Sequence, residues 1–290
     1  MSYQILEQLQ QHKTKLLNSV ELGQGMQLAA WFNQHDLVHV CSDHHTLSLY
    51  TQGGYESYQK TAQGWRNGGG PDRFCLMPQA QESIWDLRGE LFFVHLYYTD
   101  THLRQMATKI WDKEPNIIQL DEKAFVNDPY ITQLYRQFLL SYNWQQNDHL
   151  LQLSSAAMQL LTHVLQNYSN LHWRLPEIKG GLAPFTLRYV KDWIEQHLHL
   201  PLTIADLAAQ ANLSEYHFAH MFRRSTHMTP HQYVMQRRLQ TAYLYLRTHL
   251  HLNLTEIAIL CGFSSASHFS RCFRQYYGYQ PSLLRLQIDY

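Results

Sequence analysis

The sequence of 290 residues has no net charge, because 23 lysine and arginine residues balance 23 aspartate and glutamate residues. That balance argues against a general polyanion binder. Only four cysteines are present (Cys41, Cys75, Cys261 and Cys272), with neither a CxxC pair nor zinc-ligand spacing, so we expect buried, reduced thiols. No apolar run approaches the roughly 20 residues of a membrane span, and the start MSYQILEQLQQHKTKLL lacks a signal-peptide core. We therefore expect a cytoplasmic protein.

Catalytic signatures are also missing. The chain has no GxSxG, Walker loop or GxGxxG, and its GGGPD segment lacks the Lys-Ser/Thr that phosphate binding needs. A cupin metal site would need an HxH…E…H arrangement. His44 and His45 are instead adjacent, His95 stands alone, and no glutamate lies at ligand spacing. We predict no enzyme activity, no metal site and no cofactor.

The strand and helix patterns of the sequence divide the chain into two parts. Residues 31–98 are predicted to form strands, with Gly53-Gly54 as a hairpin turn between TLSLY and YESY. Helical periodicity follows at 102–111, 129–142 and 148–168, and strands followed by helices predict an α+β module. The segment RLPEIKGGLAP has two prolines and two glycines and is typical of a linker. We predict domains at 1–173 and 184–290, joined by a linker at 174–183.

Charge is divided unevenly between these parts. Residues 184–290 carry ten lysine or arginine residues and six acidic residues, a net charge of +4, which leaves −4 on the preceding residues. A basic half beside an acidic half suggests nucleic acid as a partner of the basic one.

A repeat in the last hundred residues supports this. Two short amphipathic helices share one spacing fifty residues apart, with apolar positions Ile204, Leu207, Ala208 and Ala211 in the first and Leu254, Ile257, Ala258 and Cys261 in the second. Each opens on a capping-box pattern, Thr203 with Asp206 and Asn253 with Glu256. Each ends at a residue that tolerates a left-handed backbone, Asn212 or Gly262, and Ser214 or Ser264 is expected to cap the next helix. This is the helix-turn-helix arrangement, present twice.

The second helix of each copy has two faces. The inward set is predicted to be Phe218, Met221, Phe222 and Ser225 in the first copy, and Phe269, Cys272, Phe273 and Tyr276 in the second. The outward set is Tyr216, His220 and Arg223, and Ser267, Arg271 and Arg274. Because a helix-turn-helix places its second helix in the major groove, we expect Tyr216, His220, Ser267 and Arg271 to face base edges. Arg271 suits guanine, whereas Arg223 and Arg274 suit phosphate.

A helix from Thr229-Pro230 to about Thr248 is predicted between the copies. It would be roughly 28 Å long, comparable with the roughly 34 Å between successive major grooves. Arg237 and Arg238 on this helix would either touch phosphate or pair with acids in the core.

These residues resemble a known family. RRLQTAYLYL and LTEIAILCGFSSASHFSRCFRQYYGYQPSLLR are similar to the DNA-binding domain of AraC/XylS transcription regulators, through Ile257-Ala258, Gly262-Phe263, Phe269, Phe273, Gly278 and Pro281. The resemblance covers about 184–287 and implies an all-α domain of two helix-turn-helix units that binds double-stranded promoter DNA and contacts RNA polymerase. It implies base-reading positions at Tyr216, Ala219, His220, Ala266, Ser267 and Arg271. Ala219 and Ala266 are small, so a thymine-methyl contact suits them better than a hydrogen bond.

The front of the chain resembles the cupin-like sensor domains of the same family, through RFCLMPQAQESIW and LFFVHLYY. This implies an N-terminal β-barrel that holds a small effector, followed by helices that dimerise. The apolar stripe at 148–168 would form the dimer face or pack inside its own subunit. Seven side chains could line the barrel mouth: Trp31, His39, Tyr50, Tyr55, Trp65, Trp85 and His95. Their aromatic character, without clustered arginine, favours a neutral or aromatic effector.

Three functions remain open. The leading one is a sequence-specific regulator, an activator, that responds to a small effector. A second is a regulator without a ligand, controlled by a protein partner or by its own abundance. A remote third is a cupin enzyme fused to a DNA-binding domain.

Overall fold

The computed structural model describes residues 9, 12–23, 25–111, 115, 117–171 and 180–286. The chain divides into two compact units, each described by itself below. Unit 1 comprises Met1–Tyr142 and Ala156–Pro176, and unit 2 comprises Asn143–Ser155 and Glu177–Tyr290. Residues 174–179 of the expected linker lie outside the described residues. No helix in the described ranges combines the length and apolar character needed to cross a bilayer.

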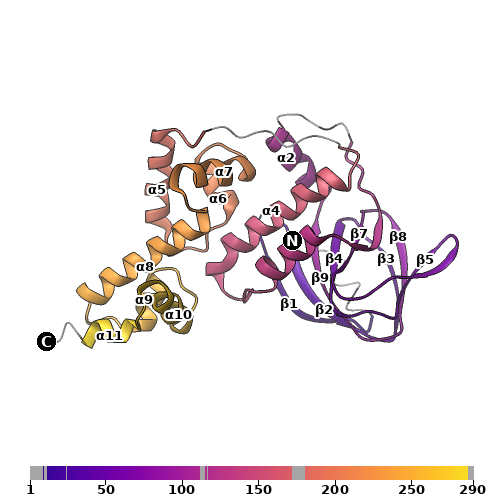
Figure 1. The fold of residues 1–290 in the computed structure, drawn as a ribbon, viewed down its shortest axis with the longest axis horizontal. Helices are drawn as coiled ribbons and strands as arrows, with labels where there is room; N and C mark the ends of the chain where they lie inside the picture. The colour runs from indigo at the N-terminus through magenta and orange to yellow at the C-terminus, as the bar shows by residue number, and fades with distance from the viewer. Residues whose placement is uncertain are drawn as a thin grey trace. The chain divides into compact units, whose positions relative to one another are not determined.

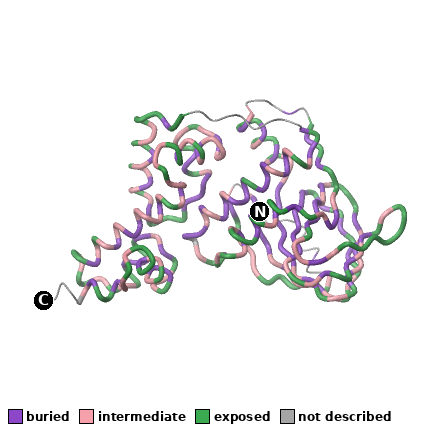
Figure 2. Tube along the Cα trace, viewed as in Figure 1, coloured by how far each residue is buried: buried purple, intermediate pink, exposed green. Residues whose placement is uncertain are grey.

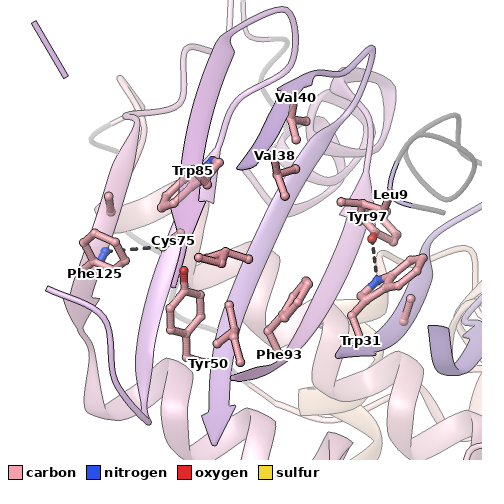
Figure 3. Packing of buried hydrophobic residues seen from close by; sticks show 14 residues of the cluster. Leu9, Trp31, Val38, Val40, Tyr50, Cys75, Trp85, Phe93, Tyr97 and Phe125 are labelled. Carbon is pink, nitrogen blue, oxygen red and sulfur yellow. Dashed lines mark hydrogen bonds between the residues drawn. The ribbon is translucent and has the colours of Figure 1, made fainter. Parts of the chain in front are cut away.

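Unit 1 is built on two antiparallel sheets (Figure 1). The larger has the order β1 (Lys15–Glu21), β2 (Gln27–Asn33), β9 (Leu91–Tyr98), β4 (His45–Gly53), β7 (Arg73–Met77) and β10 (Lys123–Asn127). The smaller has the order β3 (Asp36–Cys41), β8 (Glu82–Leu87), β5 (Ser57–Thr61) and β6 (Gly64–Asn67). Both sheets contribute to one apolar cluster, which includes Trp31, Val38, Tyr50, Trp85 and Phe93 (Figure 3).

The strand predictions need two corrections. The strands begin at Lys15 rather than at 31, and β10 follows helix α2 (Asp100–Trp111). The burial along β1 does not alternate, and Leu16 and Leu17 are exposed, so this edge strand has no period-two signal.

Gly53-Gly54 is not a hairpin turn. β4 pairs with β7 and β9, whereas β5 pairs with β6 and β8, so the two glycines lead the chain from one sheet to the other. Both have positive φ (70° and 78°), and a Cβ at Gly53 would lie 2.3 Å from the carbonyl oxygen of Glu90. Gly54 N–H donates to that same oxygen at 2.8 Å. Glycine is therefore required for a close crossing rather than for a hairpin.

The helices before residue 170 follow the prediction with one change. The helix expected at 129–142 is α3 (Pro129–Leu134), followed by a π-helical turn at Tyr135–Leu139, in which Leu140 N–H donates to Tyr135 O at 2.7 Å. α4 (Leu150–Asn167) follows a 3₁₀ turn at Asn147–His149 and contributes residues to both units. Its apolar stripe is covered within the chain (Figure 2), in agreement with packing inside its own subunit: Leu151, Ala157, Leu160, Leu161, Val164 and Leu165 are buried, and Leu150 is half-buried.

Unit 2 consists of two helical groups on one shared helix (Figure 1). α5 (Pro184–His197), α6 (Ile204–Gln210) and α7 (Glu215–Thr226) pack on the first half of α8 (Pro230–Thr248). α9 (Leu254–Leu260), α10 (Ala266–Tyr277) and α11 (Pro281–Leu286) pack on its second half. Val234 belongs to the first core, and Leu239, Ala242 and Leu246 belong to the second.

The predicted caps of these helices are confirmed, with one exception. Capping boxes start α6 at Thr203, α8 at Thr229 and α9 at Asn253. Asn212 and Gly262 both have positive φ, 52° and 79°, in the turns. Ser214 caps α7, but Ser265 rather than Ser264 caps α10, because the second turn is one residue longer.

All four cysteines are free, as expected, but they are not all buried. Cys75 and Cys261 are buried, Cys272 is half-buried and Cys41 is exposed on β3.

Candidate nucleic-acid interface

The second helix of each helix-turn-helix is held by aromatic side chains on its inner face. Phe218 and Phe222 anchor α7, and Phe269 and Phe273 anchor α10; all four are fully buried. Burying an aromatic side chain stabilises the fold by about 1.5–3 kcal/mol, so these anchors fix which face of each helix is outward. One predicted inward residue is misplaced: Tyr276 is exposed, and its hydroxyl accepts a hydrogen bond from Gln236 Nε2 at 3.0 Å.

The outward faces carry the predicted DNA-facing residues. His220, Arg223, Ser267, Arg271 and Arg274 are exposed. The remaining three positions, Tyr216, Ala219 and Ala266, are half-buried near the amino-terminal ends of the helices. In α10, an open hollow is lined by Ser267, Ser270, Arg271, Arg274, Gln275 and Gln280. Hydroxyl, amide and guanidinium groups are suited to base edges and phosphates.

Charge on these faces is not neutralised locally. Within the described part of the chain, Arg223, Arg271 and Arg274 form no ion pair with an acidic side chain. His220 lies in van der Waals reach of Tyr216, with ring centroids 4.7 Å apart. Partial burial of the ring, together with the charges of Arg223 and His217, lowers the pKa of His220, so it is neutral at pH 7 and can donate or accept a hydrogen bond.

Arg237 and Arg238 are not part of this surface. Arg237 pairs with Glu195, with Nε 2.6 Å from Oε1. Arg238 is 2% exposed and donates to the carbonyl oxygens of Leu198 at 2.9 Å and Leu200 at 2.7 Å. The sequence left open whether Arg237 and Arg238 touch phosphate or pair inside the protein. Both pair inside the protein, although the partners of Arg238 are carbonyl groups rather than acids.

Comparisons with known proteins agree with this geometry. A helix-turn-helix domain family model matches residues 207–287. The probable transcriptional regulator LumQ of Photobacterium leiognathi is 40% identical over 93 residues, which are 32% of this chain and 37% of LumQ. The regulatory protein SoxS of Salmonella typhimurium is 37% identical over 97 residues, which are 33% of this chain and 90% of SoxS. The chain belongs to the AraC/XylS family of transcription regulators.

The two named regulators match 32% and 33% of this chain. A probable AraC family regulator from Rhodopseudomonas palustris is 30% identical over 36% of this chain and 97% of the solved one, with a TM-score of 0.33. The matched segments cover 37% of LumQ and 36% of GbdR of Pseudomonas aeruginosa, little more than a third of each regulator. The chain therefore carries an AraC-type DNA-binding domain, and what unit 1 does is a separate question.

Unit 2 also contains a buried cluster that the sequence did not reveal. Asp148, His149 and His268 bring one carboxylate oxygen and two imidazole nitrogens within 4.8 Å of one another, which is a spacing that could hold a metal ion. The positive charges of Arg238 and Arg271 act on this cluster and oppose a cation there. His268 lies between the two predicted faces of α10, and no local pattern connects it with Asp148, which is 120 residues earlier.

In unit 1 of this AraC/XylS member, the predicted effector residues separate into three groups. Tyr50, Trp85 and His95 line one cavity of about 50 Å³. Trp31 is buried in the adjoining cluster without lining the cavity. The other three lie on the surface: Tyr55 is 66% and Trp65 44% exposed, and His39 pairs with Glu82.

The cavity wall is apolar apart from a few polar groups. Ser48 and His95 are register partners on β4 and β9, and both line the cavity together with Asn33 and Tyr50. Trp31 Nε1 donates to Tyr97 Oη at 2.9 Å, and Tyr97 Oη lies 2.8 Å from His95 Nδ1 (Figure 3 shows the first bond). Burial lowers the pKa of His95 to about 3, so the ring is neutral at pH 7.

Proposed function

We propose that this AraC/XylS member is a sequence-specific transcription regulator that reads two major-groove boxes, one with α7 and one with α10. The observation that carries the proposal is the pair of alike helix-turn-helix units. Among the described residues, Arg223 on the outward face of the first copy and Arg271 and Arg274 on that of the second form no ion pair with an acidic side chain. α8 has 19 residues and is therefore roughly 28 Å long, close to the roughly 34 Å that separates successive major grooves. Transcription activation through RNA polymerase belongs to the same proposal.

Selection from random DNA with the full-length protein tests the reading of two boxes. Wild type should enrich two short boxes about one helical turn apart. Arg271→Ala should relax one base position in only one box, since a bidentate arginine–guanine contact contributes about 1–3 kcal/mol of discrimination.

Arg274→Ala is the matched control, because it removes the same charge one turn further along α10. It should weaken binding to all sequences alike. It should also make the slope of log binding constant against log salt concentration shallower by about one, the value for one phosphate contact. If both variants leave the selected sequence and the salt slope unchanged, α10 does not contact DNA.

The proposed role of unit 1 is that of a cupin-like sensor whose cavity takes a small neutral effector, aromatic or largely apolar. The apolar walls and the neutral His95 support this ligand class. At about 50 Å³ the cavity has room for about three to five water molecules, so only a small group fits without adjustment of the walls.

Thermal unfolding with a library of neutral and phosphorylated metabolites tests the sensor role. A neutral ligand at a hundred times its Kd should add about 2.7 kcal/mol to the free energy of unfolding, and His95→Phe should remove this shift. If only phosphorylated compounds raise the Tm, the proposed ligand class is wrong. If no compound does, regulation by a protein partner or by abundance takes its place.

Two further points complete the proposal. Dimerisation through 148–168 receives no support from the apolar stripe of α4, which is covered within the chain. Enzyme activity is not proposed, since the matched relatives named above are called regulators.

A further inference from the structure

A buried acidic side chain touches the inner edge of the second recognition helix. Asp148 belongs to the 3₁₀ turn Asn147–His149, and its Oδ2 forms an ion pair with Nδ1 of His268 in α10. Both residues are 3% exposed. The Ser264 hydroxyl, in the turn before α10, lies 3.4 Å from the other carboxylate oxygen, and His268 Nε2 lies 3.0 Å from Cys272 Sγ. One carboxylate thus contacts both the turn and the first helical turn of α10.

His268 lies beside the DNA-facing residues. At 100° per residue, positions 268 and 271 are about 60° apart around the helix axis. His268 therefore marks the border between the buried face of α10 and the face that presents Arg271. A small rotation of α10 about its axis would move both side chains together and turn Arg271 away from its base.

The first copy has a different contact at the equivalent position. The position equivalent to His268 is His217, fifty-one residues earlier, which is also a histidine. His217 is half-buried, and its Nδ1 lies 2.7 Å from the hydroxyl of Ser214, the N-cap of its own helix. This partner belongs to the cap of its own helix, whereas the partner of His268 comes from the turn before α4.

Contacts with Asp148 and Cys272 favour a protonated His268. Burial is the largest single influence on His268 and lowers its pKa, but the hydrogen bonds to Asp148 and Cys272 and the charges of these two groups together raise the pKa to about 9. The same contact outweighs the effect of burial on Asp148 and lowers the pKa of that carboxyl. The other ionisable groups that face the pair are His149, with its ring centroid 4.8 Å from that of His268, and His231, Arg238 and Arg271.

We propose that Asp148 is a positioning residue that sets the orientation of α10 on DNA and thereby the specificity of the second box. The proposal rests on the proposed function, since it requires that α10 reads one of the two boxes. Asp148 immediately precedes His149 and α4, and α4 contributes residues to both units. A residue outside the family's helix-turn-helix segment therefore controls one recognition helix and leaves the other alone.

The affinity of full-length Asp148→Asn for three DNA probes tests this. One probe carries both boxes, and in each of the other two probes one box is scrambled. We expect the affinity for the probe that keeps only the α10 box to fall at least tenfold. The affinity for the probe that keeps only the α7 box should stay within twofold of the wild-type value. Glu195→Gln is the matched control, because it breaks the ion pair with Arg237 in the same unit and should change neither box. Equal losses on both boxes, or no loss on either, would overturn the proposal.

Two further measurements separate positioning from general destabilisation. In wild type, affinity for the α10 box should fall as pH rises through about 9, where His268 loses its proton, while the α7 box serves as the internal reference. This pH dependence should be absent in Asp148→Asn. The double variant Asp148→Asn/His268→Gln leaves no unpaired buried charge, so it should lose less affinity for the α10 box than Asp148→Asn does.

The outcomes for the two proposals are distinct. If wild type selects no DNA, the proposed function fails and this inference falls with it. If wild type selects two boxes but the pH profile of the α10 box is the same with and without Asp148, only the inference is wrong.

Discussion

Arg238 is a charged side chain that holds unit 2 together rather than binding DNA. Burial lowers the pKa of its guanidinium to about 10, so it remains charged at pH 7. Its donors satisfy two carbonyl groups, Leu198 and Leu200, at the end of α5. Arg238→Met should lower the free energy of unfolding by about 3–5 kcal/mol, because both carbonyls lose their donor in a buried site. Urea titration followed by helical circular dichroism measures this loss.

The adjacent Arg237 provides the control for that prediction. Arg237 and Glu195 are each about one-third exposed, and ion pairs of this kind contribute about 0–1 kcal/mol. Arg237→Met should therefore cost no more than about 1 kcal/mol. Similar losses for the two variants would mean that the carbonyl contacts of Arg238 do not stabilise unit 2.

At the scale of the elements, the two helix-turn-helix turns look alike in sequence but differ in what surrounds them. Asn212 and Gly262 share a positive φ. A Cβ at Gly262 would lie 2.1 Å from the carbonyl oxygen of Leu198 and 2.9 Å from the guanidinium of Arg238, whereas Asn212 is exposed. The left-handed backbone explains both residues, but only the second turn also requires the absence of a side chain.

Exchanging the two turn residues tests this difference. Gly262→Asn should lower the free energy of unfolding by at least about 1–3 kcal/mol, since the backbone of Leu198 must shift to make room. Asn212→Gly should change it by less than about 1 kcal/mol. Thermal unfolding of each variant gives the comparison, and a loss of under 1 kcal/mol for Gly262→Asn would contradict it.

How much of each element the sequence predicts depends on how local its signals are. The caps at Thr203, Thr229 and Asn253 and the left-handed residues were predictable because each involves neighbours within a few positions. Assigning the cap of α10 to Ser264 was wrong by one residue because two serines are adjacent there. The contact of His268 with Asp148 could not be predicted, since it joins residues 120 positions apart.

At the scale of the whole chain, the family motif predicted unit 2 far better than any pattern predicted unit 1. Strands β4 and β5 follow one another in sequence but lie in different sheets, and a hairpin rule fails at such a crossing. Three of the seven predicted effector residues line the cavity, because alternation along a strand shows which side chains share a face but not which face is inside. Tyr55 and Trp65 lie outside, although they are aromatic.

Both units should lose stability in mild acid, and for the same reason. Burial lowers the pKa of His95 in unit 1 to about 3, and burial with the charges of His149 and Arg238 lowers that of His231 in unit 2 to about 4. An unfolded histidine has a pKa of about 6.5, so between about pH 4 and 6.5 the unfolded chain binds protons that the folded chain does not. The free energy of unfolding should therefore fall as pH decreases through this window, by up to about 1.4 kcal/mol per pH unit for each histidine.

Variants assign this acid sensitivity to its unit. His95→Gln should make the pH dependence of unit 1 shallower, and His231→Gln should do the same for unit 2 while leaving unit 1 unchanged. Urea titrations at several pH values between 4 and 7, followed by hydrogen exchange to separate the two units, measure both slopes. Because each glutamine stays neutral in both states, a slope that survives the substitution must come from other groups, and the buried histidine would then not be the source of the acid sensitivity.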